Sequence, residues 1–93
     1  MQLDFIDGHG YWQHPQIGDV TKITNTPMVN DPLHSTIVQL SRSAVAGKPY
    51  TVSEVNHPFP NEYACEGIPI LTAFAALHDW DGLFWYTLTH DQL

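Results

Sequence analysis

A carboxylate, an amide and an imidazole occur close together in the stretch SEVNHP, which contains Glu54, Asn56 and His57. This stretch overlaps the β-branched and aromatic run PYTVSEV at residues 49–55, which is typical of a strand. An ionised glutamate is rarely buried without a partner, so a buried strand gains nothing from Glu54 at its tip. The pattern instead indicates a rigid strand that presents Glu54 for binding or reaction.

Two other stretches combine imidazole, phenol and indole groups. HGYWQHP contains His9, Tyr11 and Trp12, and GLFWY contains Trp85. An indole face stacks on the apolar face of a pyranose ring, and polar side chains hydrogen-bond to its hydroxyl groups. Because a carboxylate can attack or stabilise an oxocarbenium-like centre, the combination with Glu54 indicates carbohydrate chemistry.

Strand-like and helix-like patterns alternate along the chain. The predicted strands lie near residues 2–8, 49–55 and 82–88, and the predicted helices near 32–46 and 67–79. This βαβαβ order is typical of an α/β fold with parallel strands and right-handed crossovers. Ligands bind at the carboxyl ends of parallel strands, so the polar and aromatic residues are expected to meet there.

Several residues have definite expected places in these elements. We expect Leu3 and Phe5 to contact the core, Asp31 to cap the first helix and Gly47 to end it. Cys65 is expected to be a small buried residue, since free cysteine is usually buried. As the single cysteine of the chain it forms no internal disulfide.

Length and composition predict one small folded domain over residues 1–93. Ten acidic residues against three Lys and Arg give a formal charge of −7, which disfavours nucleic acid and anionic membranes as partners. Met1 is followed by acidic and polar residues, and no apolar stretch approaches the roughly 20 residues that cross a bilayer. Neither a signal peptide nor a membrane span is expected.

Three motifs in order resemble a known family. HGYW after the first strand, TVSEVN at the end of the second and GLFWY in the third resemble the last three βα units of a clan A glycoside hydrolase. These enzymes are (β/α)8 barrels and include cellulase-like and β-galactosidase-like members. The resemblance implies a C-terminal barrel fragment that hydrolyses β-linked glycosides with retention. It implies that Glu54 is the nucleophile, that His9 and Tyr11 position it, and that Trp85 stacks on the sugar.

The sequence departs from this family at the second carboxylate. A retaining glycosidase needs two carboxyl groups about 5–5.5 Å apart, and the family supplies the acid/base from a strand that is not in this sequence. A barrel typically needs about 250 residues, and this chain has 93. We therefore expect weak or no catalysis. Asp7, Glu62 and Glu66 are the internal alternatives for the second carboxylate, and Asp7 is also interpretable as a turn residue.

Structural interpretations of the same residues remain open. Glu54 is alternatively an exposed strand-end residue or the partner of Lys48 or Arg42, and Trp85 is alternatively a core residue. We read Trp12 mainly as a packing residue, with substrate contact as its possible second role. Six histidines raise the question of a metal, but no spacing matches a zinc motif, so no metal or cofactor is expected.

A second class of function is assembly without catalysis. The outer strands of a short parallel sheet have unpaired edges that invite pairing with another copy. Val52, Phe84 and Leu88 are expected to face solvent as residues that would line a barrel interior. The alternative to a hydrolase is therefore a self-associating α/β homo-oligomer that binds carbohydrate.

Overall fold

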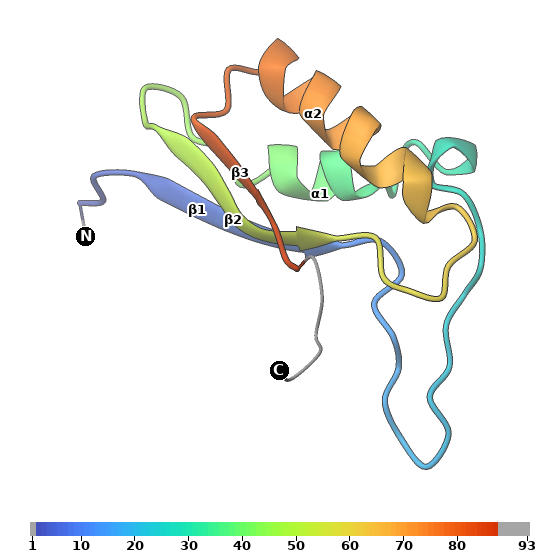
Figure 1. Ribbon diagram of the computed structural model, residues 1–93. Coiled ribbons are helices and arrows are strands. Elements are labelled where there is room, and N and C mark those ends of the chain that lie inside the picture. Colours follow the sequence, from blue (N-terminus) through green and yellow to red (C-terminus); the bar gives the residue numbers. More distant parts are fainter. Residues whose placement is uncertain (1, 88–93) are drawn as a thin grey trace.

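Three parallel strands form one sheet in the computed structural model, which describes residues 2–87 (Figure 1). β1 spans Ile6–Tyr11, β2 spans Tyr50–Asn56 and β3 spans Gly82–Trp85. β2 lies between β1 and β3 and pairs in parallel with both. The predicted α/β class is therefore confirmed, and the carboxyl ends of the three strands lie at one edge of the sheet.

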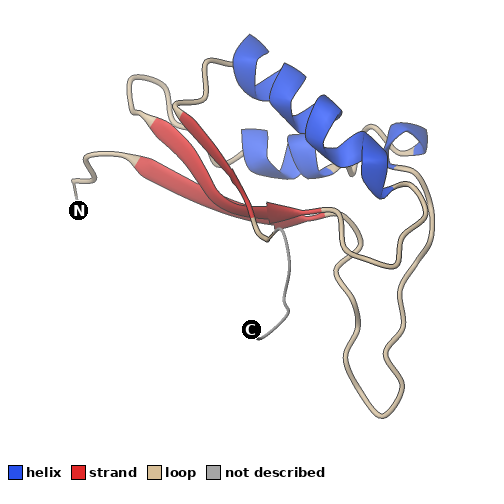
Figure 2. Cartoon of the chain, in the orientation of Figure 1, coloured by secondary structure: helices blue, strands red, loops and turns tan. Residues whose placement is uncertain are grey.

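Two helices cover one face of this sheet (Figure 2). α1 spans Thr36–Ser41 between β1 and β2, and α2 spans Gly67–Leu77 between β2 and β3. Short 3-10 turns at η1 (Met28–Asn30) and η2 (Ala64–Glu66) precede them. Right-handed crossovers that progress in one direction place both helices on the same side. No helix of the described chain covers the opposite face, which we call the open face.

The core lies between the sheet and the helices. β2 contributes Val52 and Val55, which are 0% exposed, and they pack with Leu40 of α1 and Leu71 of α2. The buried hydroxyl of Tyr50 donates a hydrogen bond to Leu40 O at 2.7 Å, and burial raises the pKa of Tyr50. The prediction that Val52 faces solvent is wrong, because its side chain points under the helices.

Two glycines allow α1 to lie directly on β1. Gly8 and Gly10 are buried on the covered face. A Cβ atom at Gly10 would lie 3.1 Å from atoms of both Leu40 and Thr36, which is closer than such contacts normally allow. Since strand residues alternate between faces, the residues on either side of these glycines point to the open face.

β1 starts and ends later than the predicted strand near residues 2–8. The glycines of β1 resemble turn residues in the sequence, but they are required by the close approach of α1. Leu3 and Phe5 precede the strand and are 45% and 56% exposed, so their predicted core contacts are wrong.

α1 is shorter than the predicted helix near residues 32–46. Ser35, rather than Asp31, caps it, because the Ser35 hydroxyl accepts a hydrogen bond from the Val38 N–H at 3.4 Å. Gly47 has a φ of +79° and lies in a later turn before β2. The predictions that Asp31 starts the helix and Gly47 ends it are therefore wrong.

α2 agrees with the predicted helix near residues 67–79 to within two residues. Its buried residues, Gly67, Leu71 and Ala75, follow one another at intervals of four and form a single stripe. Cys65 lies in η2 and is exposed, so the prediction that it is buried is wrong.

β3 is described for only part of the predicted strand near residues 82–88. Leu83 and Trp85 pack against the core, whereas Phe84 points to the open face and is 60% exposed, as expected. Leu88 lies outside the described residues. None of the helices in residues 2–87 has the length and apolar character needed to cross a bilayer.

Candidate functional site

A β-bulge in β2 determines which side chains reach the open face. Gly8 pairs with Val52, but His9 pairs with Glu54, so Ser53 has no partner in β1. Val52 and Val55 are both buried on the covered face although they are three residues apart. The side chains of the two residues between them, Ser53 and Glu54, therefore both lie on the open face. Bulges commonly redirect side chains in this way beside functional sites.

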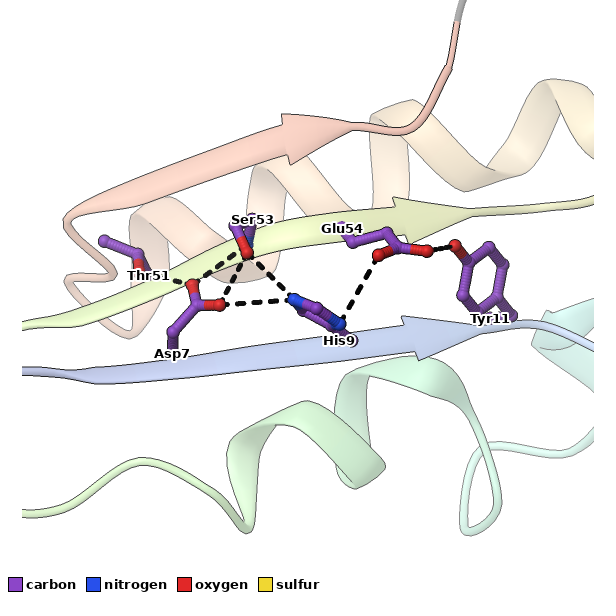
Figure 3. A network of polar contacts seen from close by, with 6 residues as sticks. All are labelled: Asp7, His9, Tyr11, Thr51, Ser53 and Glu54. Carbon is purple, nitrogen blue, oxygen red and sulfur yellow. Dashed lines mark hydrogen bonds and ion pairs between the residues drawn. The ribbon is translucent and has the colours of Figure 1, made fainter. Parts of the chain in front are cut away.

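Glu54 is held by the two residues that the sequence analysis placed beside it (Figure 3). The Tyr11 hydroxyl donates a hydrogen bond to Glu54 Oε1, and His9 Nδ1 lies 3.4 Å from Glu54 Oε2. The Glu54 side chain is 33% exposed, so it keeps access to solvent. Within residues 2–87, no ion pair joins Glu54 to Lys48 or Arg42, the partners considered in the structural alternative.

Asp7 accepts hydrogen bonds from β2 on the other side of His9 (Figure 3). Its carboxylate accepts from the Thr51 hydroxyl at 2.6 Å and from the Ser53 hydroxyl and N–H at 2.5 and 3.1 Å. Hydrogen bonds from Ser53 and Thr51 lower the pKa of Asp7 below its ordinary value. Asp7 is thus a strand residue that joins β1 to β2 rather than a turn residue.

None of the three alternative carboxylates faces Glu54. The imidazole of His9 separates Asp7 from Glu54, because Nε2 lies 3.3 Å from Asp7 and Nδ1 faces Glu54. Glu62 accepts a hydrogen bond from Asn25, and Glu66 accepts one from the Met28 N–H. Those two carboxylates hold the long connection between β1 and α1.

A cavity of about 810 Å³ opens at the carboxyl ends of the strands, within the roughly 300–1,000 Å³ range of small-molecule sites. The predicted residues Tyr11, Glu54, Asn56, His57 and Trp85 all line it. The lining residues that the prediction did not select are mostly aromatic or apolar, with one imidazole and one hydroxyl: His14, Pro15, Ile17, Pro58, Phe59, Ala64, Ile68, Tyr86 and Thr87. Among the described lining residues, Glu54 is the one carboxylate.

The two tryptophans of the prediction differ in their placement. Trp85 lines the cavity but also packs against the buried cluster, close to Gly67 at the start of α2. Trp12 does not line the cavity. It is 5% exposed, and its Nε1 donates to Thr26 O at 2.8 Å, so Trp12 is a packing residue rather than part of the wall.

His57 lines the cavity and is 2% exposed. Asn61 and Glu66 act to raise the pKa of its imidazole, but burial has the larger effect. Burial lowers the pKa of His57 below the ordinary 6.5, because the charged ring is costly to desolvate. The neutral imidazole is therefore the form that the folded chain accommodates.

This burial predicts a loss of stability in mild acid. As the pH falls below about 6.5, the unfolded chain binds a proton at His57 before the folded chain does, so the free energy of unfolding decreases. Urea unfolding at pH 7.5 and 5.5 is expected to show a smaller decrease for His57→Leu than for the native chain. His34→Leu, at an exposed histidine, is the control and is expected to keep the native decrease. An equal decrease in the native chain and His57→Leu would contradict the assignment.

Thr51 and Ser53 were not among the predicted site residues. The sequence feature that could have identified them is the alternation of polar residues with Tyr50 and Val52. Such alternation indicates a strand with one uncovered face. The bulge at Ser53 leaves no such signal, because it depends on pairing with a distant strand.

The chain is thus a small α/β protein with a three-stranded parallel sheet and a carboxylate, an imidazole and a phenol clustered at its strand ends. Comparison with models of protein families, with curated proteins and with solved structures finds no match to this chain. Within residues 2–87, no group of three or more His, Cys, Asp or Glu side chains is arranged to hold a metal ion.

Proposed function

We propose that the cavity binds a β-linked glycoside and that Glu54 is the nucleophile of a retaining displacement. The observation that carries the proposal is the Glu54 carboxylate, held by Tyr11 and His9 at the wall of a cavity that also contains Trp85. A Glu54 oxygen attacks the anomeric carbon, the bond to the aglycone oxygen breaks, and that oxygen leaves with the electron pair. Water then hydrolyses the resulting glycosyl ester.

The charges around the cavity favour a neutral sugar. No Lys or Arg is among the described lining residues, and the chain carries a formal charge of −7. A uronic acid or sulfated sugar would meet the negative field of the protein without a cation to pair with. Asn56 contributes an amide that can hydrogen-bond to sugar hydroxyl groups.

The single carboxylate of the described cavity wall limits the reaction. A positioned general acid contributes about 10²–10⁴-fold to such reactions. Unactivated glycosides therefore require a second carboxyl group opposite Glu54. Aglycones that leave readily as anions do not require it for the first step, so activated aryl glycosides are the substrates expected to react.

The same proposal extends to the architecture. We infer that the sheet corresponds to the closing three strands of a (β/α)8 barrel. Two features support this inference: both helices lie on one face, and polar residues that would line a barrel interior lie on the open face. The order of the motifs HGYW, TVSEVN and GLFWY supports it as well.

Covalent trapping tests the proposed nucleophile without requiring an acid catalyst. The chain is incubated with a panel of 2,4-dinitrophenyl 2-deoxy-2-fluoro-β-glycosides of glucose, galactose, mannose and cellobiose. The 2-fluoro group slows hydrolysis of the glycosyl ester, so one adduct per chain is expected by mass spectrometry, and peptide mapping is expected to place it on Glu54. Absence of an adduct with all four reagents, or an adduct on another residue, would overturn the proposal.

The open face favours self-association as a second property. Parallel sheets are normally covered on both faces, but here the open face exposes Phe84 at 60%, and β1 and β3 are edge strands. Light scattering coupled to size-exclusion chromatography at micromolar concentration is expected to give a mass above the 10.5 kDa monomer. Phe84→Ser is expected to lower that mass, whereas Leu77→Ser, at a position 72% exposed on α2, is not. A native monomer would contradict the prediction.

A further inference from the structure

We propose that Asp7 is a positioning residue for Glu54, acting through His9 and through the Ser53 bulge. This inference rests on the proposed function, because it assigns a role toward the proposed nucleophile. Asp7 is not part of the described cavity wall and lies on the far side of His9 from Glu54. Its effect on Glu54 is therefore indirect.

The first link is the bulge itself. The register between β1 and β2 skips Ser53, so this residue has no Cα partner in β1. Asp7 Oδ1 accepts the Ser53 N–H at 3.1 Å, and Asp7 Oδ2 accepts the Ser53 hydroxyl at 2.5 Å. The backbone donor at the bulge is thus satisfied by a side chain. Asp7 thereby holds the bulge that brings Glu54 to the open face.

The second link is the orientation of the imidazole. His9 Nε2 lies 2.9 Å from Ser53 Oγ and 3.3 Å from Asp7 Oδ2, while His9 Nδ1 lies 3.4 Å from Glu54 Oε2. Asp7 and Ser53 thus fix the Nε2 side of the ring. The opposite nitrogen, Nδ1, is thereby directed toward Glu54.

The row Asp7, His9 and Glu54 thus places one imidazole between two carboxylates. The Tyr11 hydroxyl donates to the remaining Glu54 oxygen, so both oxygens of the proposed nucleophile have a partner. Replacing the Asp7 carboxylate weakens the contact that orients the His9 ring. It also weakens the bulge, and displacement of a reacting group by about 1 Å can cost 10²-fold in rate.

The test uses Asp7→Asn, which keeps the size of the side chain and removes its charge. The matched control is Asp31→Asn, because Asp31 forms the other described Asp–His pair, with His34 at 2.8 Å, away from the cavity. Imidazole ¹⁵N NMR is expected to give the same His9 resonances in the native chain and in the control. In Asp7→Asn, the His9 resonances are expected to shift, because the ring loses the carboxylate that orients it. The rate of fluoroglycoside labelling is expected to fall about 10–100-fold in Asp7→Asn only.

An unchanged His9 spectrum in Asp7→Asn would overturn the inference. If Asp7→Asn does not fold, as judged by circular dichroism, Ser53→Ala replaces it. That variant removes the hydroxyl that contacts both Asp7 and His9, and it is expected to slow labelling and shift the His9 resonances. If the native chain is not labelled at all, the proposed function fails, while the His9 spectra still decide the role of Asp7.

Discussion

Replacement of Glu54 by glutamine is expected to reduce covalent labelling by several orders of magnitude, because the reaction loses its nucleophile. The amide is nearly the same size as the carboxylate and still accepts the hydrogen bond from Tyr11. The fold is therefore expected to persist, and intact-protein mass spectrometry is expected to show no adduct. Glu62→Gln is the matched control, since Glu62 bonds to Asn25 and does not line the cavity. It is expected to label at the native rate.

Truncation of the same residue gives a second readout. In Glu54→Ala, azide is expected to enter the vacated space and attack the anomeric carbon of a 2,4-dinitrophenyl β-glycoside. A carbon–nitrogen bond forms, the carbon–oxygen bond breaks, and dinitrophenolate leaves with the electron pair. The expected product is the α-glycosyl azide, detectable by NMR. Labelling of Glu54→Gln at the native rate would show that Glu54 is not the nucleophile.

Replacement of Leu71 by alanine is expected to lower the free energy of unfolding by about 2–5 kcal/mol. Leu71 is 0% exposed in the centre of the stripe by which α2 packs on the sheet. The substitution removes buried methyl groups and leaves a cavity that the rigid strand beneath cannot fill. Domains are stable by only about 5–15 kcal/mol, so this single change would remove a large share of the total.

Urea unfolding followed by circular dichroism measures this loss. Leu77→Ala is the matched control on the same helix, because Leu77 is 72% exposed. It is expected to change the free energy of unfolding by no more than about 0.5 kcal/mol. Equal effects at the two positions would mean that the Gly67–Ala75 stripe does not face the sheet.

The parts of the fold that were predictable are those whose signals are local. The alternation of strands and helices is in the sequence pattern, and parallel pairing follows from it. β2 has a β-branched run, and α2 has apolar residues at regular spacing, so their positions were predicted within two residues. Glu54, Tyr11 and His9 were expected to meet because strand order alone brings them to one edge.

The parts that were wrong depend on contacts between distant segments. β1 requires glycine at position 10 because Leu40 and Thr36 leave no room for a side chain. α1 starts at Thr36 rather than near residue 32 because the Ser35 hydroxyl caps it. The sequence alone shows neither the contact of Gly10 with α1 nor the choice of Ser35 over Asp31 as the cap.

The site shows the same division between local and distant signals. Asp7, His9 and Tyr11 share one face by simple alternation, which a sequence displays. Trp12 is a packing residue, as it was mainly interpreted from the sequence, but the backbone carbonyl of the long connection that accepts its N–H has no signal in the sequence. The skipped pairing of Ser53 is a property of two strands together.

Because Ser53 is skipped, the direction of the Glu54 side chain depends on the number of residues in β2 rather than on their types. With strict in-and-out order along β2, a residue two positions after Val52 would turn inward beneath the helices, and Glu54 occupies that position. The extra residue exchanges the two faces of the sheet for every side chain of β2 that follows it. If β2 paired with β1 without the bulge, the Glu54 carboxylate would point into the apolar core.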